Sequence, residues 1–148
     1  MTLKEQVSTG IMTAMKEQNK VRLNALRNIS AAFLEFEKEK AGNVVRDDVA
    51  LTILSKLEKK RKESITLYRQ GNRDDLADQE QAELEVIQSM LPQKLSDEEL
   101  EKEISSLIST NSFSGRKDLG QIMKIMMSDF AGRIDGNSVR KIAEKLLG

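Results

Sequence analysis

The sequence predicts an all-α protein with a four-helix N-terminal unit followed by a three-helix C-terminal unit, and two observations predict it. Apolar residues recur at intervals of three and four, and no stretch alternates as a half-buried strand would. Apolar residues make up 39% of the 148 residues but aromatic residues only 3%, so the core has to be largely aliphatic. Such a core favours packed helices over sheets, because aromatic and β-branched residues are the ones that fill strands.

Four helices are expected before the single proline, Pro92. The third is expected to begin near Asp47, and the pairs Gly42-Asn43 and Gly71-Asn72 interrupt the apolar pattern as glycines at helix ends do. The four apolar faces consist of Leu3, Val7, Ile11 and Met15 in the first helix; Leu23, Leu26, Ile29, Phe33 and Phe36 in the second; Val49, Ile53, Leu57, Ile65 and Tyr68 in the third; and Leu76, Leu84, Ile87 and Leu91 in the fourth.

Pro92 predicts the domain boundary, with one domain over residues 1–92 and the other over 93–148. A proline cannot continue a helix, because it lacks the amide donor and clashes with the preceding turn. Ser96 and Glu99 then form an S-x-x-E capping box, so the next helix is expected to begin near Asp97. Two more helices are expected, one near 115–127 and one over the apolar positions Val139, Ile142, Ala143, Leu146 and Leu147.

The composition excludes several kinds of chemistry. The chain has no Cys and no His, which rules out disulfides, Ser-His and Cys-His catalytic pairs, and the usual ligand sets of zinc, haem and iron–sulfur clusters. No cofactor and no metal site are therefore expected. No apolar run reaches the length of a signal peptide or a membrane span, so a cytoplasmic protein without a membrane partner is the expectation.

The net charge is zero, with 24 basic and 24 acidic residues, but charge is distributed unevenly in the first unit. Residues 54–73 include seven basic and two acidic residues, whereas residues 74–91 include six acidic residues and no basic one. Two readings stay open: the neighbouring helices form a hairpin whose faces attract each other, or Lys59, Lys62 and Arg69 follow a phosphate backbone. Arg61 falls on the apolar arc and would need a carboxylate partner if buried.

The second unit has a similar division of charge, because residues 111–148 include seven basic and four acidic residues. Lys117, Gln121 and Lys124 follow a helical spacing and form a small cationic face opposite the apolar positions. Gly120 lies inside that helix, where glycine is unfavourable unless its missing side chain is needed. Either another backbone approaches closely there or a ligand does.

Basic residues of both units are the candidates for contacts with RNA phosphates. The candidates are Lys59, Lys62, Arg69, Arg73, Arg116, Lys117, Lys124, Arg133, Arg140 and Lys141. An enzyme would have to use acid–base groups chosen from Asp118, Asp135, Lys117 and Glu83. No spacing pairs these four groups, and each is more simply a surface or capping residue.

Three stretches resemble a known family: Lys56–Pro92, the segment RKDLGQIMK at Arg116–Lys124, and GRIDGNSVRKIAEKLL at Gly132–Leu147. Together they resemble the YqeY family, whose C-terminal half is similar to the tail domain of GatB, the B subunit of the glutamine-dependent aspartyl/glutamyl-tRNA amidotransferase. The chain has Met90, Leu119 and Ile134 where members often have Tyr, Met and Ala, and these exchanges preserve apolar character.

The resemblance implies a cytosolic, all-helical protein with a GatB-tail-like C-terminal domain. In the amidotransferase that tail domain helps to bind the tRNA elbow, whereas glutamine hydrolysis and phosphoryl transfer occur in parts that this chain lacks. We therefore expect a non-catalytic tRNA-binding accessory protein, linked to tRNA charging or tRNA-dependent amidotransfer, with no DNA partner. The alternatives are a protein-interaction module that docks on an aminoacyl-tRNA synthetase or amidotransferase, and a component with carbon–nitrogen ligase activity by family analogy.

Overall fold

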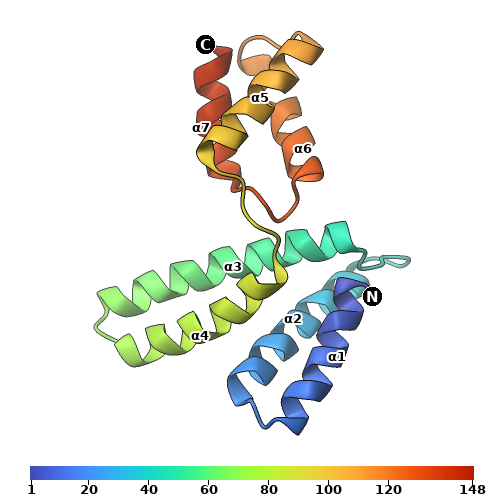
Figure 1. The fold of residues 1–148 in the computed structure, drawn as a ribbon, viewed down its shortest axis with the longest axis vertical. Helices are drawn as coiled ribbons and strands as arrows, with labels where there is room; N and C mark the ends of the chain where they lie inside the picture. Colours follow the sequence, from blue (N-terminus) through green and yellow to red (C-terminus); the bar gives the residue numbers. More distant parts are fainter. The chain divides into compact units, whose positions relative to one another are not determined.

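A computed structural model describes residues 1–148, and its regular elements are helices (Figure 1). The chain divides into two compact units, Met1–Pro92 and Gln93–Gly148, which we call unit 1 and unit 2. Unit 1 contains α1 (Leu3–Lys16), α2 (Lys20–Glu39), α3 (Asp47–Gln70) and α4 (Asp74–Met90). Unit 2 contains α5 (Asp97–Asn111), the 3-10 helix η1 (Arg116–Asp118), α6 (Leu119–Asp129) and α7 (Gly136–Leu147). The all-α fold class is confirmed, and the division is consistent with the predicted boundary at Pro92.

The start of α1 is fixed by side chains that accept its free backbone amides. The Glu5 amide donates to Thr2 Oγ1 at 3.1 Å, and the Thr2 amide donates to Glu5 Oε2 at 3.3 Å, which completes a capping box. The Leu3 amide donates to Asp47 Oδ1 at 2.9 Å, and Asp47 is the first residue of α3. The beginnings of α1 and α3 are therefore joined by a hydrogen bond across 44 positions of the sequence.

Unit 1 is built around the antiparallel hairpin of α3 and α4, with α2 packed against α4 and α1 against α2 (Figure 1). Its core is a single cluster of buried apolar side chains, each worth about 1.5–3 kcal/mol where a large side chain is fully buried. The cluster consists of Val7, Leu26, Ile29, Phe33, Val45, Ala50, Leu54 and Ile87. These side chains come from all four helices and from the loop before α3.

Unit 2 has a separate core between α5, α6 and α7. Ser96 caps α5 as predicted, since the Glu99 amide donates to Ser96 Oγ at 3.1 Å. The helix predicted near 115–127 starts instead as the 3-10 turn η1, after Gly115 at a φ of +71°, and α6 follows it without a break. The buried side chains of this core are Leu100, Ile104, Ile122, Met126, Ile134, Val139 and Ala143.

The segment between the two units is short. Leu91 packs against the core of unit 1 and Leu95 against the core of unit 2, so each end of the segment is anchored in its own unit. Only residues 92–94 lie between these two anchors. None of the helices has the length and apolar character needed to cross a membrane.

Candidate nucleic-acid interface

The contact between α3 and α4 largely buries an arginine. Arg61 Nη1 donates to Glu80 Oε2 at 2.7 Å and to Glu83 Oε2 at 2.6 Å, and the Arg61 side chain is only 13% exposed. The sequence predicts that a buried Arg61 needs a carboxylate partner, and the structure provides two. Because an unpaired buried charge is very unfavourable, these ion pairs serve the packing of the hairpin.

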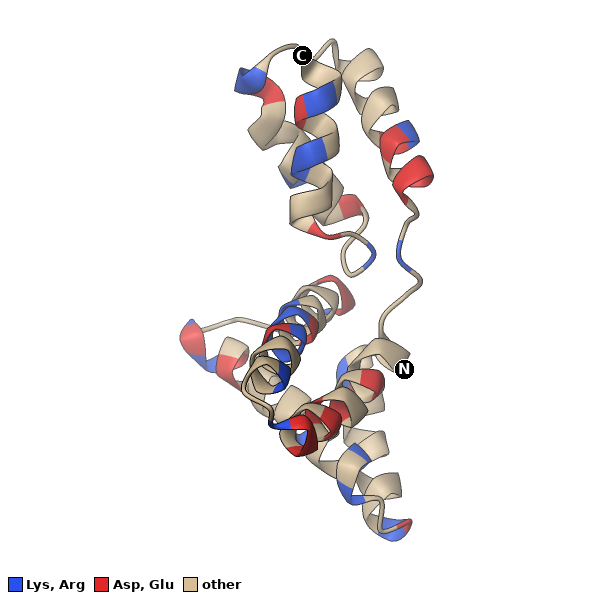
Figure 2. Cartoon of the chain, turned by 90° about the vertical axis from the view of Figure 1, so that its left-hand side faces the viewer, with Lys and Arg blue, Asp and Glu red and all other residues tan.

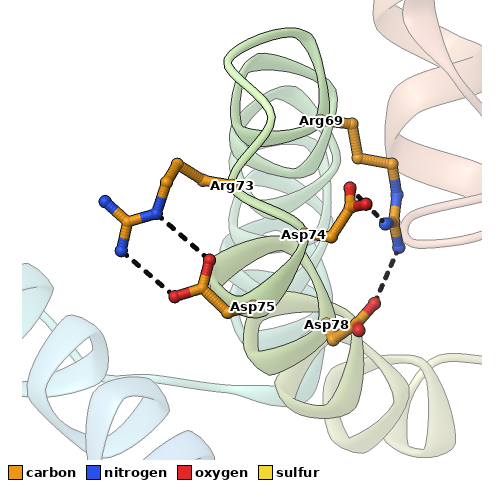
Figure 3. Close-up of polar contacts among 5 residues, drawn as sticks. All are labelled: Arg69, Arg73, Asp74, Asp75 and Asp78. Carbon is orange, nitrogen blue, oxygen red and sulfur yellow. Dashed lines mark hydrogen bonds and ion pairs between the residues drawn. The ribbon is translucent and has the colours of Figure 1, made fainter.

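Two further arginines bind carboxylates at the end of the hairpin (Figure 3). Arg69 donates to Asp74 Oδ1 at 3.3 Å and to Asp78 Oδ1 at 3.1 Å. Arg73 binds both oxygens of Asp75, each at 3.1 Å. The hydrogen bond with Asp78 raises the pKa of Arg69, that with Asp75 raises the pKa of Arg73, and the same bond lowers the pKa of Asp75. These pairs are exposed, so each contributes little to stability.

The predicted basic stripe of unit 1 is therefore largely occupied by its own acidic neighbours. Arg69 and Arg73 already bind carboxylates, and Lys62 Nζ lies 3.8 Å from Glu58 Oε2 one turn away. All four predicted contacts of unit 1 are exposed, but only Lys59 makes no ion pair within 4 Å. This arrangement favours the hairpin reading over the phosphate reading for α3.

Two lysines of α3 were missed as candidates. Lys56 and Lys60 are exposed and make no ion pair within 4 Å, like Lys59 between them. Lys56 lies three residues before Lys59 and four before Lys60, a spacing that puts the three side chains on neighbouring parts of one helix surface. That spacing is the signal that could have found them.

Unit 2 contains a cationic face formed by η1 and α6. Lys117, Gly120 and Lys124 are exposed at successive intervals of three and four residues, on the side opposite the buried Ile122 and Met126. Neither lysine makes an ion pair within 4 Å. We call Lys117, Gly120, Gln121 and Lys124 the α6 face.

Other basic residues of unit 2 are also exposed without an ion pair: Arg116, Arg140 and Lys141. In Figure 2 α7, which ends at the C-terminus, carries several blue segments, whereas α5, which follows the segment between the two units, carries red segments. The acidic residues of α5 are Asp97, Glu98, Glu99, Glu101 and Glu103. The charges of opposite sign in unit 2 therefore lie mainly on different helices.

Arg133 makes structural contacts within unit 2, in addition to its predicted role as an RNA contact. Its Nε donates to the Gln93 carbonyl at 3.0 Å, and its guanidinium lies 5.9 Å from the centre of the Phe130 ring. The Leu95 amide donates back to the Arg133 carbonyl at 2.9 Å. Lys94 Nζ also donates to a carbonyl of this turn, that of residue 132, at 3.1 Å. The turn between α6 and α7 therefore fixes the linker to unit 2.

The four candidate acid–base groups do not form a catalytic arrangement. Asp118 Oδ2 accepts the Ser114 amide at 2.7 Å, Asp135 caps α7, and Glu83 binds Arg61. Lys117 is exposed on the α6 face. No group of three Asp or Glu side chains is placed to hold a metal ion.

None of the five aromatic side chains is exposed at the surface, where a nucleobase could stack on it. Phe33 is buried, and the others are half-buried against the two cores or the hairpin: Phe36, Tyr68, Phe113 and Phe130. Base stacking on aromatic side chains is the usual way to bind unpaired nucleotides.

These features define a class: a two-unit, all-helical protein with an unpaired cationic face in its second unit. The chain belongs to the YqeY family, since the sequence pattern of that family, described as "Yqey-like protein", matches residues 4–147. The chain is also similar to "Altered inheritance of mitochondria protein 41, mitochondrial" of Pyrenophora tritici-repentis (strain Pt-1C-BFP). The two are 27% identical over 146 residues, which cover 97% of this chain and 80% of the relative.

Proposed function

We propose that this protein is a non-catalytic RNA-binding accessory protein that acts on tRNA or on an assembly that charges tRNA, and that unit 2 makes the contact. The observation that carries the proposal is that Lys117 and Lys124 lie exposed on one face with no carboxylate within 4 Å. Cations that are not neutralised within the protein gain most from phosphates, because binding releases the counterions of the nucleic acid.

The choice of tRNA rests on the resemblance given above, which implies that the C-terminal half of the family is similar to the GatB tail domain. The absence of exposed aromatic side chains supports a ligand recognised by backbone and shape, as a folded tRNA would be. The cytoplasmic location stays a prediction, because the name of the relative assigns that protein to mitochondria.

Charge reversal on the α6 face tests the proposal. The affinity of the full chain for tRNA is measured by fluorescence anisotropy between 50 and 200 mM salt, for the unchanged protein and for Lys117→Glu with Lys124→Glu. Each lost phosphate contact should reduce the slope of log affinity against log salt by about 0.7–0.9. We expect weaker binding, a flatter slope and an unchanged melting temperature, because both side chains are exposed.

The matched comparison makes the same change of charge in unit 1, with Lys59→Glu and Lys62→Glu. Since Lys62 already pairs with Glu58, this variant should lose stability and keep most of its affinity for tRNA. Equal losses of affinity in both variants would extend the contact to α3. If the unchanged protein does not bind tRNA even at low salt, the proposal is wrong.

A second candidate function, a module that docks on another protein, is favoured by exposed apolar side chains of unit 1. The large apolar side chains exposed there are Met1, Met12, Met15, Val21, Leu34, Val44 and Leu67. A stable complex with a purified synthetase or amidotransferase, formed without RNA and detected by size-exclusion chromatography, would favour this function. A complex that forms only with tRNA would favour the first.

A further inference from the structure

Gly120 is a helical glycine that the fold does not need. A Cβ atom built at this position meets no heavy atom within 4 Å, and the residue is exposed. Its φ does not lie in the left-handed region, whereas Gly42 and Gly115 have φ values of +88° and +71°. The sequence-based expectation that another backbone approaches Gly120 is therefore wrong.

Another helical glycine shows what a structural requirement looks like. A Cβ atom at Gly10 in α1 would lie 2.9 Å from Leu26 Cδ1 in α2, so a larger residue there would force the buried Leu26 side chain to shift. Gly120 has no such neighbour. Gly120 is the second residue of α6, directly after η1, and the fold offers room for a Cβ atom there. A requirement from outside the fold would explain why the chain keeps it.

The surroundings of Gly120 indicate what kind of ligand would need the space. Lys117 in η1 and Lys124 in α6 lie on either side of Gly120, three residues before it and four after it. Met127, one turn beyond Lys124, is 43% exposed and is the large apolar side chain that unit 2 leaves at its surface. A ligand that crosses this face meets two cations, a gap and an apolar side chain. A ribose-phosphate chain has both the charge and the apolar sugar edge that this face would contact.

We infer that Gly120 is the point of closest approach of an RNA backbone strand, which lies across α6 in van der Waals contact with the main chain while Lys117 and Lys124 bind phosphates on either side. This inference rests on the proposed function and adds a steric determinant to its electrostatic one. A side chain at position 120 would keep the strand away from the helix, and the lysines would still reach the phosphates. The two determinants therefore predict different dependences on salt.

The test compares Gly120→Ala and Gly120→Met in the full chain, with tRNA as the probe. We expect the melting temperature of Gly120→Ala to be unchanged or up to about 5 °C higher, because alanine favours the helix. Affinity for tRNA should fall about threefold in Gly120→Ala and more than tenfold in Gly120→Met. The slope of log affinity against log salt should stay the same in both, because no phosphate contact is removed.

Ser105→Met is the matched control, since Ser105 is exposed on α5, outside the α6 face. It should bind tRNA like the unchanged protein. If Gly120→Met also binds like the unchanged protein while Lys117→Glu with Lys124→Glu binds weakly, the inference is wrong and the proposed function stands. If the unchanged protein does not bind tRNA, both are wrong. A lower melting temperature of Gly120→Ala would also overturn the inference, because it would show that the fold needs the glycine.

Discussion

The two units have the same charge balance but use it differently. Unit 1 has 15 basic and 15 acidic residues and unit 2 has 9 of each, so both are neutral. In unit 1 Arg61, Lys62 and Arg69 of α3 bind acidic residues of α4 and of α3 itself, whereas Lys56, Lys59 and Lys60 stay exposed without an ion pair. In unit 2 the basic residues of η1, α6 and α7 stay exposed and unpaired. Net charge therefore says nothing about whether a unit can bind an anion.

The difference follows from where the acidic residues lie in the chain. In unit 1 a basic helix is followed at once by an acidic one, and a hairpin brings the two together. In unit 2 five of the nine acidic residues lie in α5, apart from the basic residues near Lys117. A run of like charge next to its complement is partly neutralised by folding, and a run separated from its complement stays available for a partner.

The largest expected effect that sharpens this comparison comes from Arg61→Ala. This change leaves Glu80 and Glu83 side by side in the contact between α3 and α4 without a cation. Removing one partner of a buried pair destabilises by about 3–5 kcal/mol, so unit 1 should lose about 3 kcal/mol of unfolding free energy. Urea unfolding of the full chain, followed by amide signals in each unit, measures the loss separately for the two units.

A variant without any of the three charges is the control. Arg61→Met with Glu80→Gln and Glu83→Gln should recover most of the stability, because it is the unpaired carboxylates that destabilise and not the absence of the arginine. If Arg61→Ala lowers the free energy of unfolding of unit 1 by no more than a surface substitution does, about 0.5 kcal/mol, then unit 1 does not depend on its ion pairs and the comparison fails.

The helices could be predicted from the sequence because their signals are local. The interruption at Gly71, the cap at Ser96 and the proline at residue 92 each act within a few residues, and the helices begin and end close to the predicted positions. The need of Arg61 for a carboxylate could be predicted as well. Its position on an apolar arc predicts that the side chain needs a carboxylate partner if it is buried, and the structure leaves it only 13% exposed.

Parts of the candidate site could not be predicted, because they depend on contacts between distant residues. Arg69 lies away from the predicted apolar line, yet it pairs with Asp78, nine positions further along the chain, because the hairpin brings the two together. The bond from Arg133 to the Gln93 carbonyl spans 40 positions, and no periodicity reports it. The empty space beside Gly120 is likewise a property of the packed unit and not of its helix.

A second, smaller effect is expected from Arg133→Ala, which tests whether this basic residue of unit 2 behaves like those of unit 1. The change removes the donor to the Gln93 carbonyl, while the main-chain bond to Leu95 remains. A hydrogen bond contributes about 0.5–1.5 kcal/mol net, so the linker should open about 3–10 times more often. Trypsin should therefore cleave after Lys94 faster by about the same factor. Lys141→Ala is the control, because Lys141 is exposed and unpaired, and an equal increase there would contradict the assignment.

The smallest effect is expected at the exposed end of the hairpin, where Arg73 binds Asp75. The hydrogen bond from Arg73 lowers the pKa of Asp75, so the ionised carboxylate is favoured in the folded state. Its contribution to stability is then present above the unfolded pKa, about 3.9, and is lost as the pH falls through the lower folded pKa. Asp75→Asn should have a slightly lower urea midpoint than the unchanged protein at pH 7, and the two midpoints should converge as the pH falls below about 3.9. A difference that persists at low pH would instead indicate that the substitution acts through the start of α4, where Asp75 is the second residue, and not through the ion pair.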